Sequence, residues 1–381
     1  MKTVIHRREF LRGGMAAAGT LVLGGMGTIG CAGTRRPDVT SQSRFNRPIS
    51  PDLEKMLYLA SFAPSSHNVQ PWQVQLINES TLHLRIDPMR TLPVVDAQSR
   101  EMYLSLGAFI ENFSLAANSM GHGISVSVAE SRSLRPLCTI SLERGTSSSQ
   151  VKATTKATAA AIEHRRTVRR GLSGGADVIA RCRQLAETVS ETRFFPMNGN
   201  TASRLGQITL DANIRQTADD AAQKELAGWI RFKNRDAEQK RDGLTTESME
   251  ITGIAGWVVR TFMDRDSVMG EKFRKQGIAQ VRSTVTEGAG WFVMESASDS
   301  IADCIDAGRR FERLALTCVP HGLSVHPMSQ ALEYNDTRQK VKHVVGISGT
   351  PQFLLRVGQI PGKRTPVSLR RPVSDFTAFG S

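Results

Sequence analysis

The feature that most constrains the fold is a pair of similar segments that lie far apart in the chain. The run GAFIENFSLAANSMG, which starts at Gly107, can be laid on GRRFERLALTCVPHG, which starts at Gly308. The matched pairs are Gly107 with Gly308, Glu111 with Glu312, Leu115 with Leu316 and Gly121 with Gly322. Amphipathic composition alone can produce such a match; if it is a true repeat, the chain consists of two related halves fused as a pseudo-dimer.

A second informative stretch is APSSHNVQPW, residues 63–72, which joins a predicted helix to a predicted strand. The helix at 52–61 stops before Pro64, and Pro71 and Trp72 lead into an alternating strand. The polar side chains of the loop are Ser65, Ser66, Asn68 and Gln70. Such hydroxyl and amide groups suit the edge of a flat heterocycle. The alternative is an ordinary turn that satisfies its own backbone, with Trp72 in the core.

The remaining periodicities predict an α+β fold. Helices are expected at 52–61, 100–120, 151–166, 177–189, 201–230 and 303–319, and strands at 73–77, 82–86, 124–128, 137–142, 193–197, 291–295 and 352–357. The predicted organisation is a leader at 1–33, a tether at 34–51, a first half at 52–145 and a second half at 151–376. Glycines and mixed polarity at 233–288 suggest a lid-like insertion over a site.

The leader resembles a twin-arginine export signal, because HRREFLR at 6–12 is followed by an uncharged stretch at 13–30. A cytoplasmic amphipathic N-terminus is the alternative. The leader ends in TIGCAG, which resembles a lipoprotein processing box that would lipidate Cys31; ordinary cleavage near Ala32 competes with this interpretation. We therefore expect a periplasmic or cell-envelope protein, with a membrane anchor at Cys31 and no second membrane span.

The net charge and the cysteine spacing limit the classes of ligand and metal site that the chain is expected to have. A net charge of +13 suggests nucleic acid, an anionic membrane surface or a phosphorylated ligand. Export argues against nucleic acid, and no aromatic residues are interleaved with the basic ones. Four cysteines follow the leader without CxxC spacing, at 138, 182, 304 and 318, so neither zinc nor a redox pair is indicated. Two could pair in an oxidising compartment, or all four could be buried thiols.

Four features together resemble the nitroreductase superfamily of flavin proteins, specifically an exported Acg-type branch that carries two nitroreductase-like halves in one chain. They are APSSHNVQPW, the paired glycine helices, HRRTVRR at 164–170 and LRRP in the tail. The resemblance covers residues 52–376. It implies mixed sheets flanked by helices, with FMN bound at the interface between the two halves.

The resemblance also implies which residues bind FMN. In the family, an Arg-x-Ser/Thr-x-Arg/Lys cluster and a basic C-terminal tail hold the phosphate, while a Pro-Ser-x-x-Asn loop comes from the other subunit. Here the first half would supply Pro64, Ser65, Ser66 and Asn68, and the second half Arg165, Thr167 and Arg169 with Arg370 or Arg371. One FMN per chain follows, with Arg166 and Arg170 at the surface. The alternative for both basic segments is a solvated charged surface.

The activity implied is hydride and electron transfer through FMN to a nitroaromatic, a quinone or a similar small-molecule acceptor, with no catalytic side chain and no metal. The chain would act as a monomeric pseudo-dimer. Because NAD(P)H is not expected outside the cytoplasm, the donor of an exported protein would be a membrane quinol or a redox protein. The alternatives are an exported flavin-binding or flavin-sequestering protein with a lidded site and little turnover, and a structural lipoprotein without cofactor.

Overall fold

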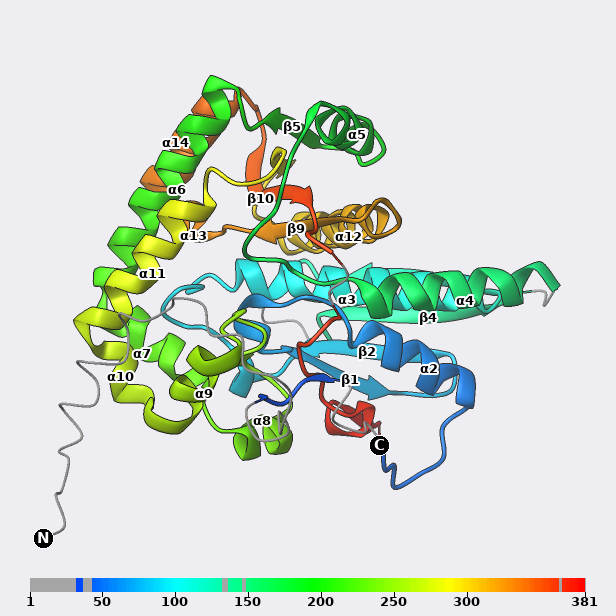
Figure 1. Ribbon diagram of the computed structural model, residues 1–381. Helices are drawn as coiled ribbons and strands as arrows, with labels where there is room; N and C mark the ends of the chain where they lie inside the picture. Colours follow the sequence, from blue (N-terminus) through cyan, green and yellow to red (C-terminus); the bar gives the residue numbers. More distant parts are fainter. Residues whose placement is uncertain (1–31, 37–42, 132–135, 146–148, 363–364, 381) are drawn as a thin grey trace, which may run out of the picture.

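The computed structural model describes residues 32–36, 43–131, 136–145, 149–362 and 365–380. Residues 1–31 of the predicted leader, with Cys31, lie outside these residues. Among the described helices, none combines the length and apolar character that a bilayer span requires. The α+β class predicted from the sequence is confirmed, because a five-stranded and a four-stranded sheet are packed against and between helices (Figure 1).

The first sheet has the strand order β11-β1-β2-β4-β3. Its strands are β1 (Trp72–Leu76), β2 (Thr81–Ile86), β3 (His122–Val128), β4 (Cys138–Arg144) and β11 (Thr377–Phe379). The strands β1 to β4 pair antiparallel, and β11 joins β1 in parallel from the end of the chain. Alternate residues of β1 face α2 (Pro51–Ala60) and α3 (Arg100–Ser119), so Trp72, Val74 and Leu76 are buried in one core with these helices.

The second sheet has the order β5-β8-β10-β9, with every neighbouring pair antiparallel. Its strands are β5 (Thr192–Pro196), β8 (Gly290–Ser296), β9 (Leu323–Pro327) and β10 (Thr350–Gln359). Helices α5 (Ala176–Glu187) and α12 (Ile301–Cys318) cover one face, and α6 (Asn200–Ala218), α13 (Gln330–Glu333) and α14 (Asn335–Val345) cover the other. Every residue of β8 is therefore buried.

The two halves share one connectivity. Apart from the elements inserted between β5 and β8 and the helices α13 and α14 between β9 and β10, each runs helix, strand, strand, helix, strand, strand. In each sheet the third and fourth of these strands are exchanged in the spatial order. The central helices α3 and α12 cross at Gly107 and Gly308: a Cβ on Gly107 would lie 2.1 Å from Ile305 O, and one on Gly308 would lie 2.0 Å from Leu104 O. The shared connectivity agrees with the predicted repeat; descent from a fused pair stays a prediction.

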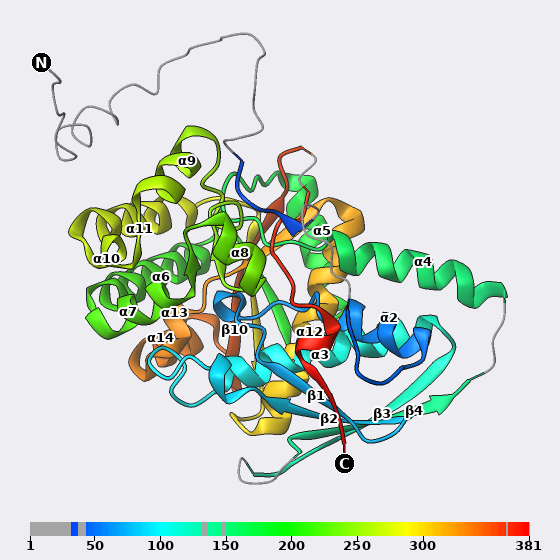
Figure 2. The same ribbon diagram turned by 90° about the horizontal axis from the view of Figure 1, so that it is seen from below.

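The second half carries a large insertion between β5 and β8. After α6 come α7 (Asp220–Trp229), β6 (Ile230–Arg231), α8 (Asn234–Lys240), β7 (Leu244–Thr245), α9 (Gly253–Phe262), α10 (Arg265–Met269) and α11 (Glu271–Thr284). The single helix predicted at 201–230 is broken at Asp219, whose carboxylate accepts hydrogen bonds from the N–H groups of Ala221 and Ala222. These helices gather on one side of the molecule, with α6, α13 and α14 (Figures 1 and 2).

The ends of the described chain pack on the body. Gly33 N–H donates to Glu247 Oε1 at 2.8 Å, and Thr34 Oγ1 donates to Glu238 Oε1 at 3.0 Å. This part of the predicted tether is therefore fixed by hydrogen bonds, because polar groups of the insertion reach it. The four cysteines of the described chain are buried free thiols, the second of the two expected alternatives.

Candidate functional site

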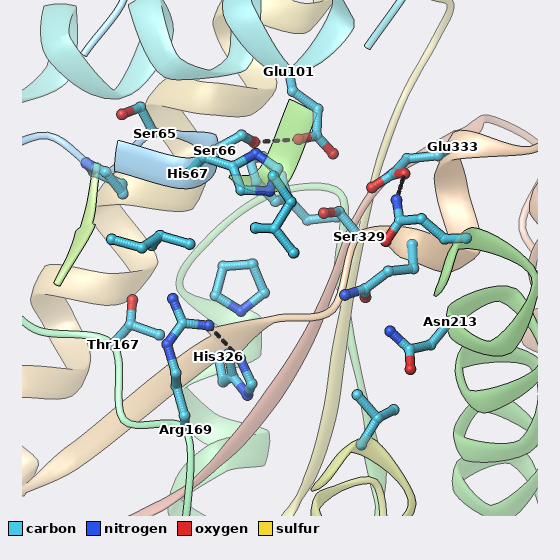
Figure 3. Close-up of a pocket in the computed structure, with 18 of the residues that line it drawn as sticks. Ser65, Ser66, His67, Glu101, Thr167, Arg169, Asn213, His326, Ser329 and Glu333 are labelled. Atoms are coloured by element: carbon cyan, nitrogen blue, oxygen red, sulfur yellow. Dashed lines mark hydrogen bonds between the residues drawn. The ribbon is translucent and has the colours of Figure 1, made fainter. Parts of the chain in front are cut away.

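A cavity of about 390 Å³ lies between the two halves. A smaller lobe of about 90 Å³ adjoins it. The residues that line both are Pro64, Ser65, His67, Thr167, Arg169 and Leu244. The cavity wall is completed by α3, by α6 and α11 of the second half, and by the segment from β9 into α13 (Figure 3). Sequence segments far apart therefore form one continuous space.

The loop after α2 is held in a strained conformation by the second half. His67, Asn68 and Gln70 have φ values of 50°, 54° and 54°. The Asn68 amide donates to Gly243 O at 3.1 Å, and the Gln70 amide donates to Arg241 O at 2.9 Å. Asn68 Oδ1 accepts from Arg370 at 3.0 Å. These bonds pin the loop so that Pro64, Ser65 and His67 face both parts of the cavity.

Each predicted residue of this loop lines the site. Pro64 and Ser65 line both spaces, Ser66 lines the larger one and Asn68 the smaller one. Ser66 Oγ is hydrogen-bonded to the Glu101 carboxylate, and Ser65 Oγ accepts from Gln70 N–H at 3.0 Å. Of these two serine side chains, only that of Ser65 bonds to the backbone of the loop, as the ordinary-turn alternative predicted. Trp72 lies in the core, which that alternative also predicted.

The basic segment that follows α4 (Ser149–His164) lies outside the helices and strands. Arg165, Thr167 and Arg169 all line the smaller lobe, whereas Val168 is buried and its N–H donates to Ser324 Oγ at 3.1 Å. The Thr167 hydroxyl forms no hydrogen bond with a described residue, so it is available to a ligand.

The two cluster arginines differ in their partners. Arg165 forms a buried ion pair with Glu312 at 3.0 Å and donates to Phe62 O at 2.8 Å. Arg169 uses Nε for Ser248 O at 3.1 Å and Nη1 for His326 Nε2 at 3.4 Å. Burial lowers the pKa of Arg169, although the nearby Glu250 raises it. Arg169 Nη2 has no hydrogen-bond partner in the described part of the chain.

Of the two tail arginines, the structure brings one to the lobe. Arg370 lines it, donates to Phe62 O at 3.1 Å, and has a buried Nε with no partner among the described residues. Arg371 instead donates to Gln70 O at 2.8 Å and to Trp72 O at 3.0 Å, and it lines neither space. Arg371 therefore holds the tail against the loop, because its Nη2 donates to two backbone carbonyls of the loop.

Two further arginines line the lobe although the sequence did not predict them there. Arg36 lines it from the presumed tether; burial, and then the charge of Arg165, lowers its pKa to about 10. Arg166, which was expected at the surface, also lines the lobe and pairs with Glu250 at 3.4 Å. No spacing rule could have found Arg36, because only the tertiary fold brings it to this lobe. Arg170 is exposed, as expected.

The opposite end of the cavity is acidic and amide-rich (Figure 3). Glu101 lies at the start of α3, where its carboxylate pairs with Arg100 at 3.2 Å. Glu333 lies in α13, and its Oε2 accepts a hydrogen bond from Gln216 Nε2. Burial, reinforced by the charge of Glu101, raises the pKa of Glu333 well above its ordinary value. The cavity is thus cationic at one end and carboxyl-lined at the other.

The two histidines of the cavity are neutral near pH 7. Burial lowers the pKa of His67 to about 4. Burial and the charges of Arg169 and Arg356 hold the pKa of His326 well below its ordinary value. No group of His, Cys, Asp or Glu that could hold a metal ion occurs within the described ranges.

No protein-family model matches the chain. Rv3131 of Mycobacterium tuberculosis, whose name proposes an NAD(P)H nitroreductase, is 27% identical over 84% of this chain and 88% of its own. PigM of a Serratia species, named in the same provisional way, is 24% identical over 81% of this chain and 88% of its own. The M. tuberculosis protein acg, whose name also proposes an NAD(P)H nitroreductase, is 24% identical over 85% of this chain and 94% of its own.

Among solved structures, the FMN-dependent nitroreductase NfnB of Mycobacterium smegmatis, in complex with NADPH, is 16% identical and covers 59% of this chain and 99% of its own, with a TM-score of 0.37. The sequence relatives extend through both halves of the chain. These relatives support the placement of the chain in the nitroreductase superfamily.

Proposed function

We propose that the chain is an FMN-dependent oxidoreductase of the nitroreductase type, with one FMN per chain. The observation that carries the proposal is the arginine-lined lobe that opens into the larger cavity. A flavin mononucleotide has a dianionic phosphate at one end and a flat ring at the other. The names of the relatives support the oxidoreductase class independently.

The donors of the smaller lobe fit a phosphate. Five arginines line it: Arg36, Arg165, Arg166, Arg169 and Arg370. The buried Arg370 Nε has no partner among the described residues. The half-buried Thr167 hydroxyl and Arg169 Nη2 form no hydrogen bond with a described residue either. A bound anion would give these donors charge-assisted hydrogen bonds, and it would remove the cost of leaving a buried donor unpaired. The phosphate would therefore be held mainly by Thr167, Arg169 and Arg370.

The larger cavity suits the ring, since ligand pockets typically measure roughly 300–1,000 Å³. Its apolar lining includes Leu104 and Ala108 of α3 and Phe311 of α12. Its polar lining includes Ser66 and His67, which can bond to the edge of a heterocycle. When bound there, FMN supplies the hydride and electron transfer to a nitroaromatic, quinone or similar acceptor. The chain orients the ring and excludes water from it.

The proposal also includes the cellular location of the protein. The sequence of the leader supports export by the twin-arginine route to the periplasm or cell envelope, with lipid attached to Cys31. The two similar halves within one chain support action as a monomer. The donor would then be a membrane quinol or a redox protein, although the names of the relatives make NAD(P)H the donor to test first. Mass spectrometry of the mature N-terminus distinguishes a lipidated Cys31 from cleavage near Ala32.

The direct test is the absorption spectrum of the purified protein, with phosphate analysis of the released cofactor. We expect flavin bands and one phosphate per flavin. A colourless protein that cannot be reconstituted with FMN would contradict the proposal. NADPH and a reduced quinol are then each tested as donors, with a nitroaromatic or a quinone as acceptor.

Variants of the smaller lobe test the phosphate assignment. Thr167→Val combined with Arg169→Gln removes a hydroxyl and a guanidinium without touching the Arg165–Glu312 pair. Each charge-assisted hydrogen bond contributes about 1.5–3 kcal/mol, so we expect FMN affinity to fall at least tenfold per group lost. The matched control is Arg170→Gln, in the same segment but exposed. Equal FMN content in the double variant and the control would refute the assignment.

A flavin-sequestering protein remains the second candidate, and one observation favours it. Phe273, Arg274, Gly277 and Val281 of α11 line the cavity, so the insertion predicted as a lid forms one of its walls. A wall of this kind would restrict access of a large donor to the ring. Flavin that stays oxidised with every donor, in a protein that binds FMN tightly, would favour sequestration over turnover.

A further inference from the structure

The side of the cavity between α6 and α13 contains polar groups that the FMN phosphate does not use. Asn213, in α6, is 9% exposed and lines the cavity, yet its buried Oδ1 has no hydrogen-bond partner within the described residues. Its side chain points into the cavity (Figure 3). A buried amide without a partner costs about 1–3 kcal/mol, so its position facing an open space indicates a ligand group there.

Glu333 faces the same space from α13. It forms no ion pair within the described ranges. Gln216 Nε2 donates to its Oε2, which leaves Oε1 available. Glu101 on α3, by contrast, has Arg100 as a charged partner and Ser66 as a hydrogen-bond donor. Of the two carboxyl groups that line the cavity, Glu333 is thus the one without an ion-pair partner among the described residues.

The groups around Glu333 make ionisation still less favourable. Burial is the largest cause of its raised pKa, followed by the negative charge of Glu101; Arg100 opposes the shift, and Asp96 and Glu225 add to it. Glu225, on α7, accepts hydrogen bonds from the N–H groups of Val94 and Val95. On the far side, Tyr334 follows Glu333 and stacks under Arg215. Glu333 therefore retains a proton at pH values where exposed glutamates have lost it.

We propose that Glu333 is the catalytic proton donor to the electron acceptor, and that Asn213 binds that acceptor between α6 and α13. The acceptor class is a neutral molecule whose oxygen gains a proton on reduction, such as a quinone. This inference rests on the proposed function, which supplies the hydride.

The electrons and protons of the proposed reduction balance. Quinone reduction to hydroquinone requires two electrons and two protons; a hydride supplies both electrons and one proton. The O–H bond of Glu333 breaks, the second proton forms a new O–H bond on the acceptor oxygen, and solvent later returns a proton to the carboxylate.

The test begins with a readout that needs no turnover. Infrared titration of the purified protein should show a protonated carboxyl band at pH 7 that is missing in Glu333→Gln. Asp336→Asn is the matched control, because this acid also lies close in sequence but is exposed and paired with Arg215. If Glu333→Gln leaves the infrared spectrum at pH 7 unchanged, the inference falls, whatever the flavin content.

Turnover with benzoquinone then tests the role. In Glu333→Gln we expect kcat to fall about 10²–10⁴-fold, the usual contribution of a general acid, with FMN content unchanged. In the unmodified protein kcat should fall as pH rises through the pKa of Glu333, and this dependence should vanish in the variant. Asn213→Ala should raise KM with little change in kcat. Unchanged kcat in Glu333→Gln overturns the inference while leaving the proposed function intact. A protein that neither contains FMN nor can be reconstituted with it overturns the proposed function.

Discussion

At the scale of single residues, the arginines of the basic segment do not all have the same role. Arg165 was predicted to bind FMN, and it does line the smaller lobe. Its charge, however, is opposed by Glu312, which is 0% exposed and whose pKa is raised by burial despite the charge of Arg165. Arg165 is therefore a structural partner first, and the loss of FMN in an Arg165 variant would not by itself identify a phosphate ligand.

This distinction predicts a stability effect. Arg165→Ala leaves the Glu312 carboxylate buried without its partner, which should cost about 3–5 kcal/mol of the free energy of unfolding. Adding Glu312→Gln should recover part of that loss, since the uncompensated charge is gone. Urea unfolding of the single and double variants measures both effects, with Arg170→Ala as the exposed control. If the double variant is no more stable than Arg165→Ala, the uncompensated charge of Glu312 is not the cause of the loss.

At the scale of elements, helices and strands with a regular hydrophobic pattern were predictable. Elements whose position depends on distant parts of the chain were not. The helix expected at 100–120 is α3, Arg100–Ser119, and the strands expected at 73–77 and 82–86 pair as β1 and β2. The three-residue strand β11 was not predicted, because its position depends on pairing with Val74 across almost the whole chain. The break at Asp219 was also missed, because the helical periodicity continues through it.

The crossing of α3 and α12 provides the test at this scale. Gly107→Ala would place a methyl group 2.1 Å from Ile305 O, a backbone atom that cannot move aside without shifting α12. We expect a loss of about 1–3 kcal/mol or more from overpacking. Gly228→Ala, near the end of α7, meets nothing within 4 Å and should be neutral or slightly stabilising. Thermal unfolding compares them; equal melting temperatures would mean that the two helices separate at little cost.

At the scale of the whole molecule, the site is built from distant parts of the chain, and for that reason the sequence predicted only some of its residues. The loop Ala63–Trp72 and the segment 165–170 were predicted to meet across the two halves, and the structure places both around one lobe. Arg36, Asn213 and Glu333 were not predicted, because the sequence has no local pattern that assigns them to one space. They reach it through packing of the chain ends and of the insertion against the two halves.

The central claim is that the arginine-lined lobe recognises the phosphate of FMN, and titration calorimetry of flavin-free protein tests it most directly. FMN and riboflavin share the ring and differ only in the phosphate. With two or more charge-assisted hydrogen bonds of about 1.5–3 kcal/mol each, FMN should bind with a stoichiometry of one per chain and about 10²-fold or more tighter than riboflavin. Equal affinities for the two flavins would contradict the account.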